Sequence, residues 1–299
     1  MTSKSSPSKT EAGRAWQIIG CLCVFASAFF FYMATAVIRW ARDAVVIDPS
    51  FFAFARFLLG FFIICGLLLI RRQKLKPRRY DLLIGRTLFN CLAVFCFYQA
   101  VALTSLAEGN ILNMTYPIFL AVLSWLFLKS QRDVTEIFMV VLAFAGVWLI
   151  LSPARLNPDI NNLWGLASGI CAAAAIIYLN MSRQHHDSET VLFYMFGLGT
   201  LFMYLLFHDN IFVPNAEQAW YLFICALFGV GGQYLLTLGL RYVTALEGGI
   251  ISSSRILMAA VLGPWVAADP PLTAAGWIGA LLIFISNIYL TYRKSKNSR

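Results

Sequence analysis

The amino-acid sequence predicts an all-α polytopic membrane protein with ten transmembrane helices, arranged as two inverted repeats of five helices. The first observation is composition: 60% of the 299 residues are hydrophobic and only 12% are charged, whereas a soluble domain carries about 25% charged residues. The second is a mean hydropathy of +0.73. The third is that the apolar residues form continuous runs, each about as long as the roughly 20-residue helix that crosses a bilayer.

Ten such runs define the predicted helices in chain order. They are Gln17–Ile38, Ser50–Ile70, Leu82–Thr104, Asn110–Leu128, Thr135–Leu151, Leu163–Met181, Thr190–Phe207, Ala219–Gly239, Gly248–Ala268 and Leu272–Leu290. Strands of a membrane barrel would instead show alternating segments of about 10 residues. Pro117 lies inside the fourth run, where its missing N–H leaves a backbone carbonyl free, which is tolerated only beside protein or water.

The segments outside these runs complete the domain organisation. Residues 1–16 are expected to be a cytoplasmic tail, and the apolar run that follows is longer than that of a cleavable signal peptide. The first helix is therefore predicted to be retained. Residues 17–151 form the predicted first repeat, residues 163–290 the second, and residues 291–299 a basic cytoplasmic tail.

Basic residues are distributed very unevenly between the two sides. With both termini cytoplasmic, the inner segments hold 17 Lys and Arg residues and the outer segments hold three. This positive-inside pattern predicts an inner-membrane protein with cytoplasmic termini. It also accounts for the net charge of +9, so we expect no nucleic-acid partner. The basic run Arg71–Arg79 is interpreted as a topology determinant, with binding of anionic lipid as the alternative.

Short echoes of sequence relate the two halves. Ala107-Glu108-Gly109-Asn110 precedes the fourth run, and Leu246-Glu247-Gly248-Gly249 precedes the ninth, 139 residues later. Because each half contains an odd number of helices, a repeat must cross the membrane in the opposite sense. Inverted repeats of this kind are typical of secondary transporters, whose substrate site lies at the midplane between the halves.

Several residues carry a resemblance to a known family: Arg56 early in the second run, the stretch from Tyr98 to Tyr116-Pro117, and its counterpart from Tyr234 through Glu247 to Arg255. With ten helices in two halves, the sequence resembles the drug/metabolite transporter superfamily, of the type built from two EamA domains. The resemblance covers nearly the whole chain and implies transport of small molecules. One departure is Lys129, where such families often have an acidic residue, whereas Asp269 retains it after the ninth run.

Three arginines remain inside the predicted helices, namely Arg56, Arg86 and Arg255. An arginine at the centre of a membrane helix costs about 2.5–3.5 kcal/mol on insertion scales, and such residues face a bundle interior, a partner or water. Arg86 lies only a few residues past Asp81, so its side chain could extend to the cytoplasmic surface. For each arginine the alternative to a substrate contact is a structural partner on a neighbouring helix.

Helical spacing predicts which polar groups meet. Asn113, Tyr116, Pro117 and Leu120 share one face of the fourth run, and a shift of 139 residues places Ser252, Arg255, Ile256 and Ala259 on the same face of the ninth. In an inverted repeat these two faces would approach each other. Arg86 and Asn90 share a face of the third run in the same way.

Four tyrosines, Tyr32, Tyr98, Tyr178 and Tyr234, occupy comparable places in the two halves, and aromatic packing is the alternative account of each. A site lined by tyrosines and arginines would suit a small, partly apolar metabolite with a carboxylate, which arginine binds in bidentate fashion. The candidate substrate-binding residues are Arg56, Arg86, Asn90, Tyr98, Asn113, Tyr116, Tyr178, Tyr234 and Arg255.

Other chemistries find little support in the sequence. No Asp or Glu lies in the middle of a run, so neither proton coupling through a buried acid nor a pump for cationic drugs is indicated. The seven cysteines contain no Cys-x-x-Cys pair, so no metal site, disulfide or cofactor is predicted. His185-His186 is interpreted as part of a solvated loop, with metal binding as the alternative.

The sequence as a whole predicts a secondary transporter that moves a small organic metabolite by alternating access. The substrate is expected to be amino-acid-like or otherwise carboxylate-bearing, and the resemblance adds S-adenosylmethionine-like molecules as candidates. Export of amphipathic drugs or metabolites with different coupling is the alternative. An intramembrane enzyme or a receptor is the non-transport alternative. The expected partners are a small-molecule substrate and membrane lipid, with a homodimer as a further possibility.

Overall fold

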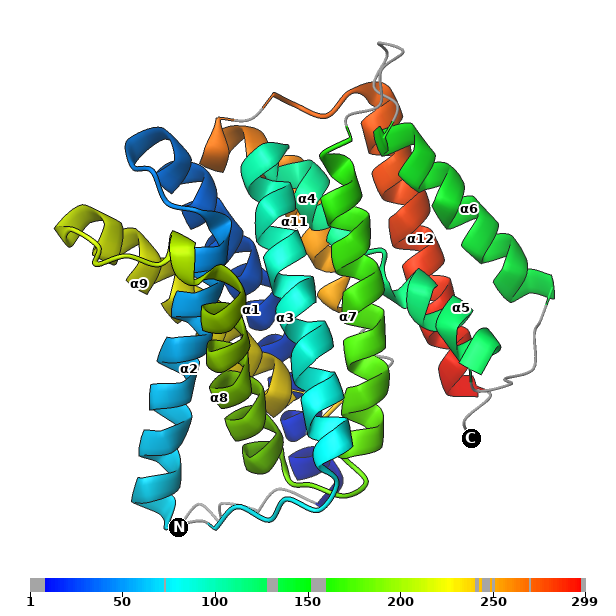
Figure 1. Ribbon diagram of the computed structural model, residues 1–299. Helices are drawn as coiled ribbons and strands as arrows, with labels where there is room; N and C mark the ends of the chain where they lie inside the picture. Colours follow the sequence, from blue (N-terminus) through cyan, green and yellow to red (C-terminus); the bar gives the residue numbers. More distant parts are fainter. Residues whose placement is uncertain are drawn as a thin grey trace, which may run out of the picture.

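The computed structural model describes residues 9–72, 74–127, 134–151, 160–239, 242–243, 248, 251–268 and 270–296. Regular structure in these ranges is helical throughout (Figure 1). The helices are α1 (Lys9–Ala44), α2 (Pro49–Arg71), α3 (Tyr80–Leu103), α4 (Leu106–Asn113), α5 (Tyr116–Phe127), α6 (Val134–Leu151), α7 (Asn162–Ser182), α8 (Ser188–Phe207), the 3₁₀ turn η1 (His208–Asn210), α9 (Ala216–Gly239), α11 (Ser254–Ala267) and α12 (Ala274–Lys296).

Within these described residues, six helices are long and apolar enough to cross a membrane: α1, α2, α3, α7, α8 and α9. Three shorter apolar helical segments, Ile137–Ile150, Ser254–Ala267 and Ala274–Tyr289, belong to the fifth, ninth and tenth predicted runs. The predicted all-α polytopic fold is confirmed. The N-tail up to residue 8, and Lys129, Glu247 and Asp269, lie outside the described residues.

The fourth predicted run is not one helix. It begins at Leu106, four residues before the predicted start, because Ser105 caps it and accepts a hydrogen bond from the Glu108 amide at 3.1 Å. It then breaks between α4 and α5. Pro117 has no N–H to donate to the carbonyl of Asn113, and the amide of Ile118 donates to Thr115 instead, at 2.9 Å. The prediction of a continuous helix from Asn110 to Leu128 is therefore wrong.

The break leaves a backbone carbonyl that another helix satisfies. Asn287 of α12 is fully buried and donates its amide to the Met114 carbonyl at 2.7 Å. Thr115 caps the end of α4 in the same region, since its hydroxyl donates to the Leu112 carbonyl at 2.6 Å. Buried backbone groups of an interrupted membrane helix need such partners, and here the second half of the chain supplies one of them.

The packing of the helices follows a two-fold relation between the halves. In chain order, α1, α2, α3, α4 and α6 of the first half correspond to α7, α8, α9, α11 and α12 of the second. α3 packs along α7, and the counterpart of α3, which is α9, packs along α1, the counterpart of α7. α2 packs on α8, α6 on α12 and α4 on α11, so each of these helices contacts its own counterpart (Figure 1). Exchanging the two halves leaves this pattern unchanged. That is the pattern expected of two five-helix repeats related by a two-fold axis.

The two-fold relation extends to individual side chains. A Cβ on Gly60 of α2 would lie 2.4 Å from the Phe196 ring, and a Cβ on Gly199 of α8 would lie 2.6 Å from the Phe57 ring. Phe57 and Gly60 are separated from Phe196 and Gly199 by the same 139 residues. The repeated Phe-x-x-Gly pattern is thus a reciprocal contact, in which each glycine makes room for the other repeat's ring.

Two hydrophobic cores meet at α4 and α11. The larger core is built mainly from α1, α2, α3, α8 and α9, and the smaller one mainly from α4, α6, α11 and α12. Leu106 and Ala259 belong to the larger core, whereas Ile111 and Ile256, on the same two helices, belong to the smaller. Polar residues on α4 and α11 therefore lie between the two cores rather than at the lipid surface.

Candidate functional site

Two buried arginines from opposite halves of the chain meet at one aromatic ring. The guanidinium carbon of Arg56 on α2 lies 5.3 Å from the centroid of Phe31, and that of Arg255 on α11 lies 5.8 Å from the same centroid. Arg255 also lies 5.1 Å from the ring of Phe97 on α3. Each arginine is only 5% exposed. Because both guanidinium carbons lie within 5.8 Å of the same ring centroid, the two groups are close neighbours.

Polar contacts hold both guanidinium groups in place. Arg56 donates to the hydroxyl of Tyr98 at 3.4 Å. Arg255 donates to the side-chain oxygen of Asn113, and the amide nitrogen of Asn113 donates to the Ser168 hydroxyl at 2.9 Å. Because the Asn113 nitrogen is engaged by Ser168, its oxygen has to face Arg255. The predicted approach of the Asn113 and Arg255 faces is confirmed.

Tyr116, at the start of α5, completes this arginine cluster, which we define as Arg56, Tyr98, Asn113, Tyr116 and Arg255. Its phenol lies close enough to Arg255 for the two groups to interact electrostatically, as does that of Tyr98. Five of the nine candidate residues therefore gather in one place. Phe31 and Phe97 were missing from the prediction, because a phenylalanine in an apolar run has no distinguishing sequence signal.

Arg86 is the third buried arginine and does not reach the surface. It is 6% exposed, and its Nη2 contacts the sulfur of Met195 on α8 at 4.0 Å. The suggestion that Arg86 extends to the cytoplasmic surface is wrong, because its side chain turns into the α3–α8 interface. It lies near enough to Arg56 for the two positive charges to repel, and the Cys91 thiol lies near both.

These arginines have no negatively charged partner among the described residues. The described ion pairs join Arg71 to Glu189 at 3.7 Å, Arg79 to Asp81 at 2.6 Å and His208 to Asp209 at 3.2 Å. Four buried nitrogen donors among the candidate residues have no hydrogen-bond acceptor within the described residues: the Nε atoms of Arg56, Arg86 and Arg255, and the Asn90 amide nitrogen.

Such a set of groups is costly to bury. Each buried donor without an acceptor costs about 1–3 kcal/mol, and an unpaired buried charge is more costly still. Natural proteins retain such groups mainly where a ligand or a function uses them. The arrangement is suited to an anionic group with several oxygen acceptors.

Two of the predicted tyrosines lie away from the arginine cluster. Tyr178 stacks on Phe89 with 5.6 Å between ring centroids, and it packs against Gly85, where a Cβ would lie 2.3 Å from its ring. Tyr178 therefore belongs to the α3–α7 interface, as expected from the alternative of aromatic packing. Tyr234 lies within electrostatic range of Arg71, at the end of α2, and of Glu189, at the start of α8.

His186 has a structural position that the sequence did not reveal. Its Nε2 accepts hydrogen bonds from the backbone amides of Arg78 and Arg79, at 3.0 and 3.1 Å. Its Nδ1 lies 3.0 Å from the Ser182 carbonyl and carries the proton, because Nε2 acts as an acceptor. The expectation of a solvated loop holds for the exposed His185 but is wrong for His186, which is 8% exposed.

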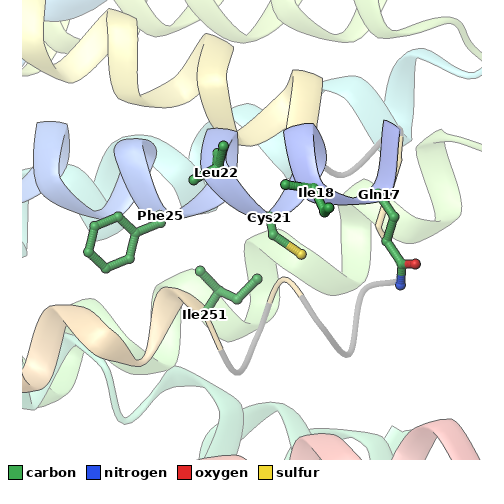
Figure 2. Close-up of a pocket in the computed structure, with 6 residues that line it drawn as sticks. All are labelled: Gln17, Ile18, Cys21, Leu22, Phe25 and Ile251. Atoms are coloured by element: carbon green, nitrogen blue, oxygen red, sulfur yellow. The ribbon is translucent and has the colours of Figure 1, made fainter. Parts of the chain in front are cut away.

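An apolar groove of about 410 Å³ lies elsewhere, along α1. Figure 2 shows its lining, Gln17, Ile18, Cys21, Leu22 and Phe25 of α1 together with Ile251. About half of the Ile18, Leu22 and Phe25 side chains is exposed. The described lining contains none of the candidate residues, so this groove is distinct from the arginine cluster.

Comparison with known proteins agrees with this architecture. The model of the EamA-like transporter family matches the chain twice, over residues 18–152 and 160–292. The pseudopaline exporter CntI of Pseudomonas aeruginosa is 23% identical over 279 residues, covering 92% of this chain and 96% of that protein. The riboflavin transporter of Vibrio cholerae is 24% identical over 305 residues, covering 96% and 93%.

A solved crystal structure shares the fold, with a TM-score of 0.60 at 16% identity, covering 94% of this chain and 98% of that one. At this identity the likeness concerns the fold alone. The two family matches together span most of the chain and coincide with helices α1–α6 and α7–α12. This chain therefore belongs to the EamA-like transporter family and is a multi-pass small-molecule transporter of the drug/metabolite type.

Proposed function

We propose that this protein transports a small organic metabolite bearing a carboxylate across the inner membrane, by alternating access. The observation that carries the proposal is the pair Arg56 and Arg255, both buried, both against Phe31, and without a carboxylate partner among the described residues. A guanidinium group offers a planar fork of donors that matches a carboxylate. A substrate carboxylate would satisfy the Nε donors that the protein leaves unpaired.

The position of the arginine cluster supports alternating access. Arg56 lies on α2 of the first half and Arg255 on α11 of the second, so one bound carboxylate would contact both halves. In transporters with inverted repeats, the site lies between repeats that rock about it. Binding across the interface would couple occupancy of the site to that movement.

Each neighbouring side chain has a place in this proposal. Tyr98 and Asn113 orient the two guanidinium groups, and the rings of Phe31 and Phe97 offer apolar surface for the rest of the substrate. The relatives named for pseudopaline and for riboflavin act on different solutes. The substrate class is therefore argued from these side chains rather than from the relatives.

The test uses the purified protein and its Arg56→Gln and Arg255→Gln variants. Thermal unfolding is first measured with a panel of amino acids and carboxylates, and the stabilising compounds are then tested for counterflow in proteoliposomes. We expect both variants to weaken binding at least about tenfold, because one charge-assisted hydrogen bond contributes about 1.5–3 kcal/mol.

Arg78→Gln is the matched control, since it removes the same charge from an exposed cytoplasmic loop and should transport normally. Normal transport by both variants of the buried arginines would overturn the proposal. Stabilisation by uncharged amphipathic compounds, unaffected by either substitution, would favour the alternative of an amphipathic-compound exporter.

A further inference from the structure

We infer that the substrate carries at least two anionic groups, and that Arg86 and Asn90 bind the second one. This inference rests on the proposed function and specifies its substrate class. It assigns a role to Arg86, which is buried but does not belong to the arginine cluster. The cluster itself would take the first carboxylate.

The balance of charge is the first argument. Arg56, Arg86 and Arg255 are all buried, and the first and last of them share the Phe31 ring. The interior therefore holds three positively charged side chains, and among the described residues no carboxylate pairs with any of them. A substrate with one carboxylate would leave most of this charge uncompensated in a medium where unpaired charge is strongly unfavourable. A substrate with two or more anionic groups would balance it.

Unused hydrogen-bond donors are the second argument. Arg86 and Asn90 lie one turn apart on the same face of α3. Among the described residues, the buried Arg86 Nε and Asn90 amide nitrogen have no acceptor, and the Arg86 Nη2 reaches a methionine sulfur, a weak acceptor, at 4.0 Å. Thr87 beside them, by contrast, donates to the Leu83 carbonyl at 2.8 Å. The unsatisfied donors on this stretch of α3 are thus those suited to an anion.

The second group would lie on the side of the cluster nearer the start of α3. Twelve residues separate Arg86 from Tyr98 on that helix, roughly 18 Å along its axis at 1.5 Å per residue. An elongated molecule with acidic groups at its two ends fits this order better than a compact one.

The experiment compares matched elongated compounds that differ by one carboxylate: adipate with adipamate, and suberate with suberamate. Dissociation constants are taken from thermal unfolding titrations of the purified protein. We expect the compound with the additional carboxylate to bind at least about tenfold more tightly to the unmodified protein. Arg86→Gln should reduce this ratio to about one, and Arg86→Lys, which keeps the charge but loses the planar fork, should give an intermediate ratio.

Arg78→Gln is again the matched control, because it removes the same charge from an exposed side chain outside the arginine cluster, and its ratio should match that of the unmodified protein. If Arg86 had only a structural role, Arg86→Gln would instead weaken the binding of both compounds of a pair equally, and it would lower the unfolding temperature of the protein without ligand. Equal binding of both members, with binding still dependent on Arg255, would overturn this inference and leave the proposed function intact. If none of the carboxylates binds, both fail.

Discussion

Asn113 decides at the level of a single residue whether Arg255 remains available to a ligand. Its oxygen accepts from Arg255, and its nitrogen is held by Ser168, which in turn donates to the Gly165 carbonyl at 2.7 Å. An amide orients the guanidinium without neutralising it. A carboxylate of the same shape would neutralise it and, under the proposed function, compete with a substrate carboxylate.

This contrast gives a prediction for Asn113→Asp. The new carboxylate should pair with Arg255, raise the unfolding temperature of the ligand-free protein and weaken carboxylate binding at least about tenfold. Gains in stability at the expense of function are typical of sites that keep unpaired groups. Unfolding curves with and without ligand measure both effects.

Asn215→Asp is the control for that variant, since Asn215 lies in the exposed segment before α9 and its oxygen caps Gln218 at 2.9 Å. A carboxylate there can make the same contact, so neither property should change. If Asn113→Asp binds carboxylates as tightly as the unmodified protein, Arg255 is not part of the binding site.

At the scale of elements, local sequence signals set some helix boundaries, and tertiary contacts set others. Ser105 and Glu108 form a capping pattern that is visible in the sequence and starts α4. Pro117 indicates that the fourth run is disturbed, but the break at Met114 and Thr115 is stabilised by Asn287, which is 173 residues away. That partner could not be predicted from hydropathy, because a single buried asparagine is usual in helix–helix contacts.

The segment between α2 and α3 depends on His186, which leads to a second prediction. His186→Ala removes the acceptor of the Arg78 and Arg79 amides and should lower the free energy of unfolding by about 1–3 kcal/mol. Thermal unfolding in detergent, together with proteolysis in the segment from residue 74 to 79, measures the loss. His185→Ala, at an exposed neighbour, should change neither. Equal stability of the two variants would show that this contact contributes nothing.

At the scale of the whole molecule, the two halves are joined by α3 with α7 and α1 with α9, and by the contacts of α2, α4 and α6 with their own counterparts α8, α11 and α12. Besides α2 and α8, the backbones of α6 and α12 touch at glycines: a Cβ on Gly146 would lie 2.7 Å from the Gly279 carbonyl, and one on Gly279 would lie 2.6 Å from the Gly146 carbonyl. Small residues allow such close approach, which stabilises membrane helices where the hydrophobic effect does not.

The reciprocal contact between α2 and α8 predicts matched effects for two substitutions. Gly60→Ala and Gly199→Ala should each reduce stability by about 1–3 kcal/mol, because the new methyl group overlaps the ring of Phe196 or Phe57. Gly66→Ala on the same helix α2, where nothing lies within 4 Å of a Cβ, should cause no loss. Unfolding midpoints in detergent provide the comparison. A loss confined to one of the two glycines would contradict the two-fold relation.

The sequence by itself determined the class of the protein, its division into two halves of apolar runs and the presence of three arginines where lipid would be unfavourable for them. These follow from length and polarity along the chain, and both are local properties. The shift of 139 residues even identified the helix face carrying Arg255 as the one that meets the face carrying Asn113, because a repeat carries tertiary information within the sequence.

Only the tertiary structure decided which candidates meet. It placed Arg56 and Arg255 on one phenylalanine ring, turned Arg86 into the α3–α8 interface, and left Tyr178 to helix packing. The physical reason is that lipid is as apolar as a leucine side chain. A membrane helix can therefore be apolar on every side, and its sequence does not reveal which face is turned toward the interior.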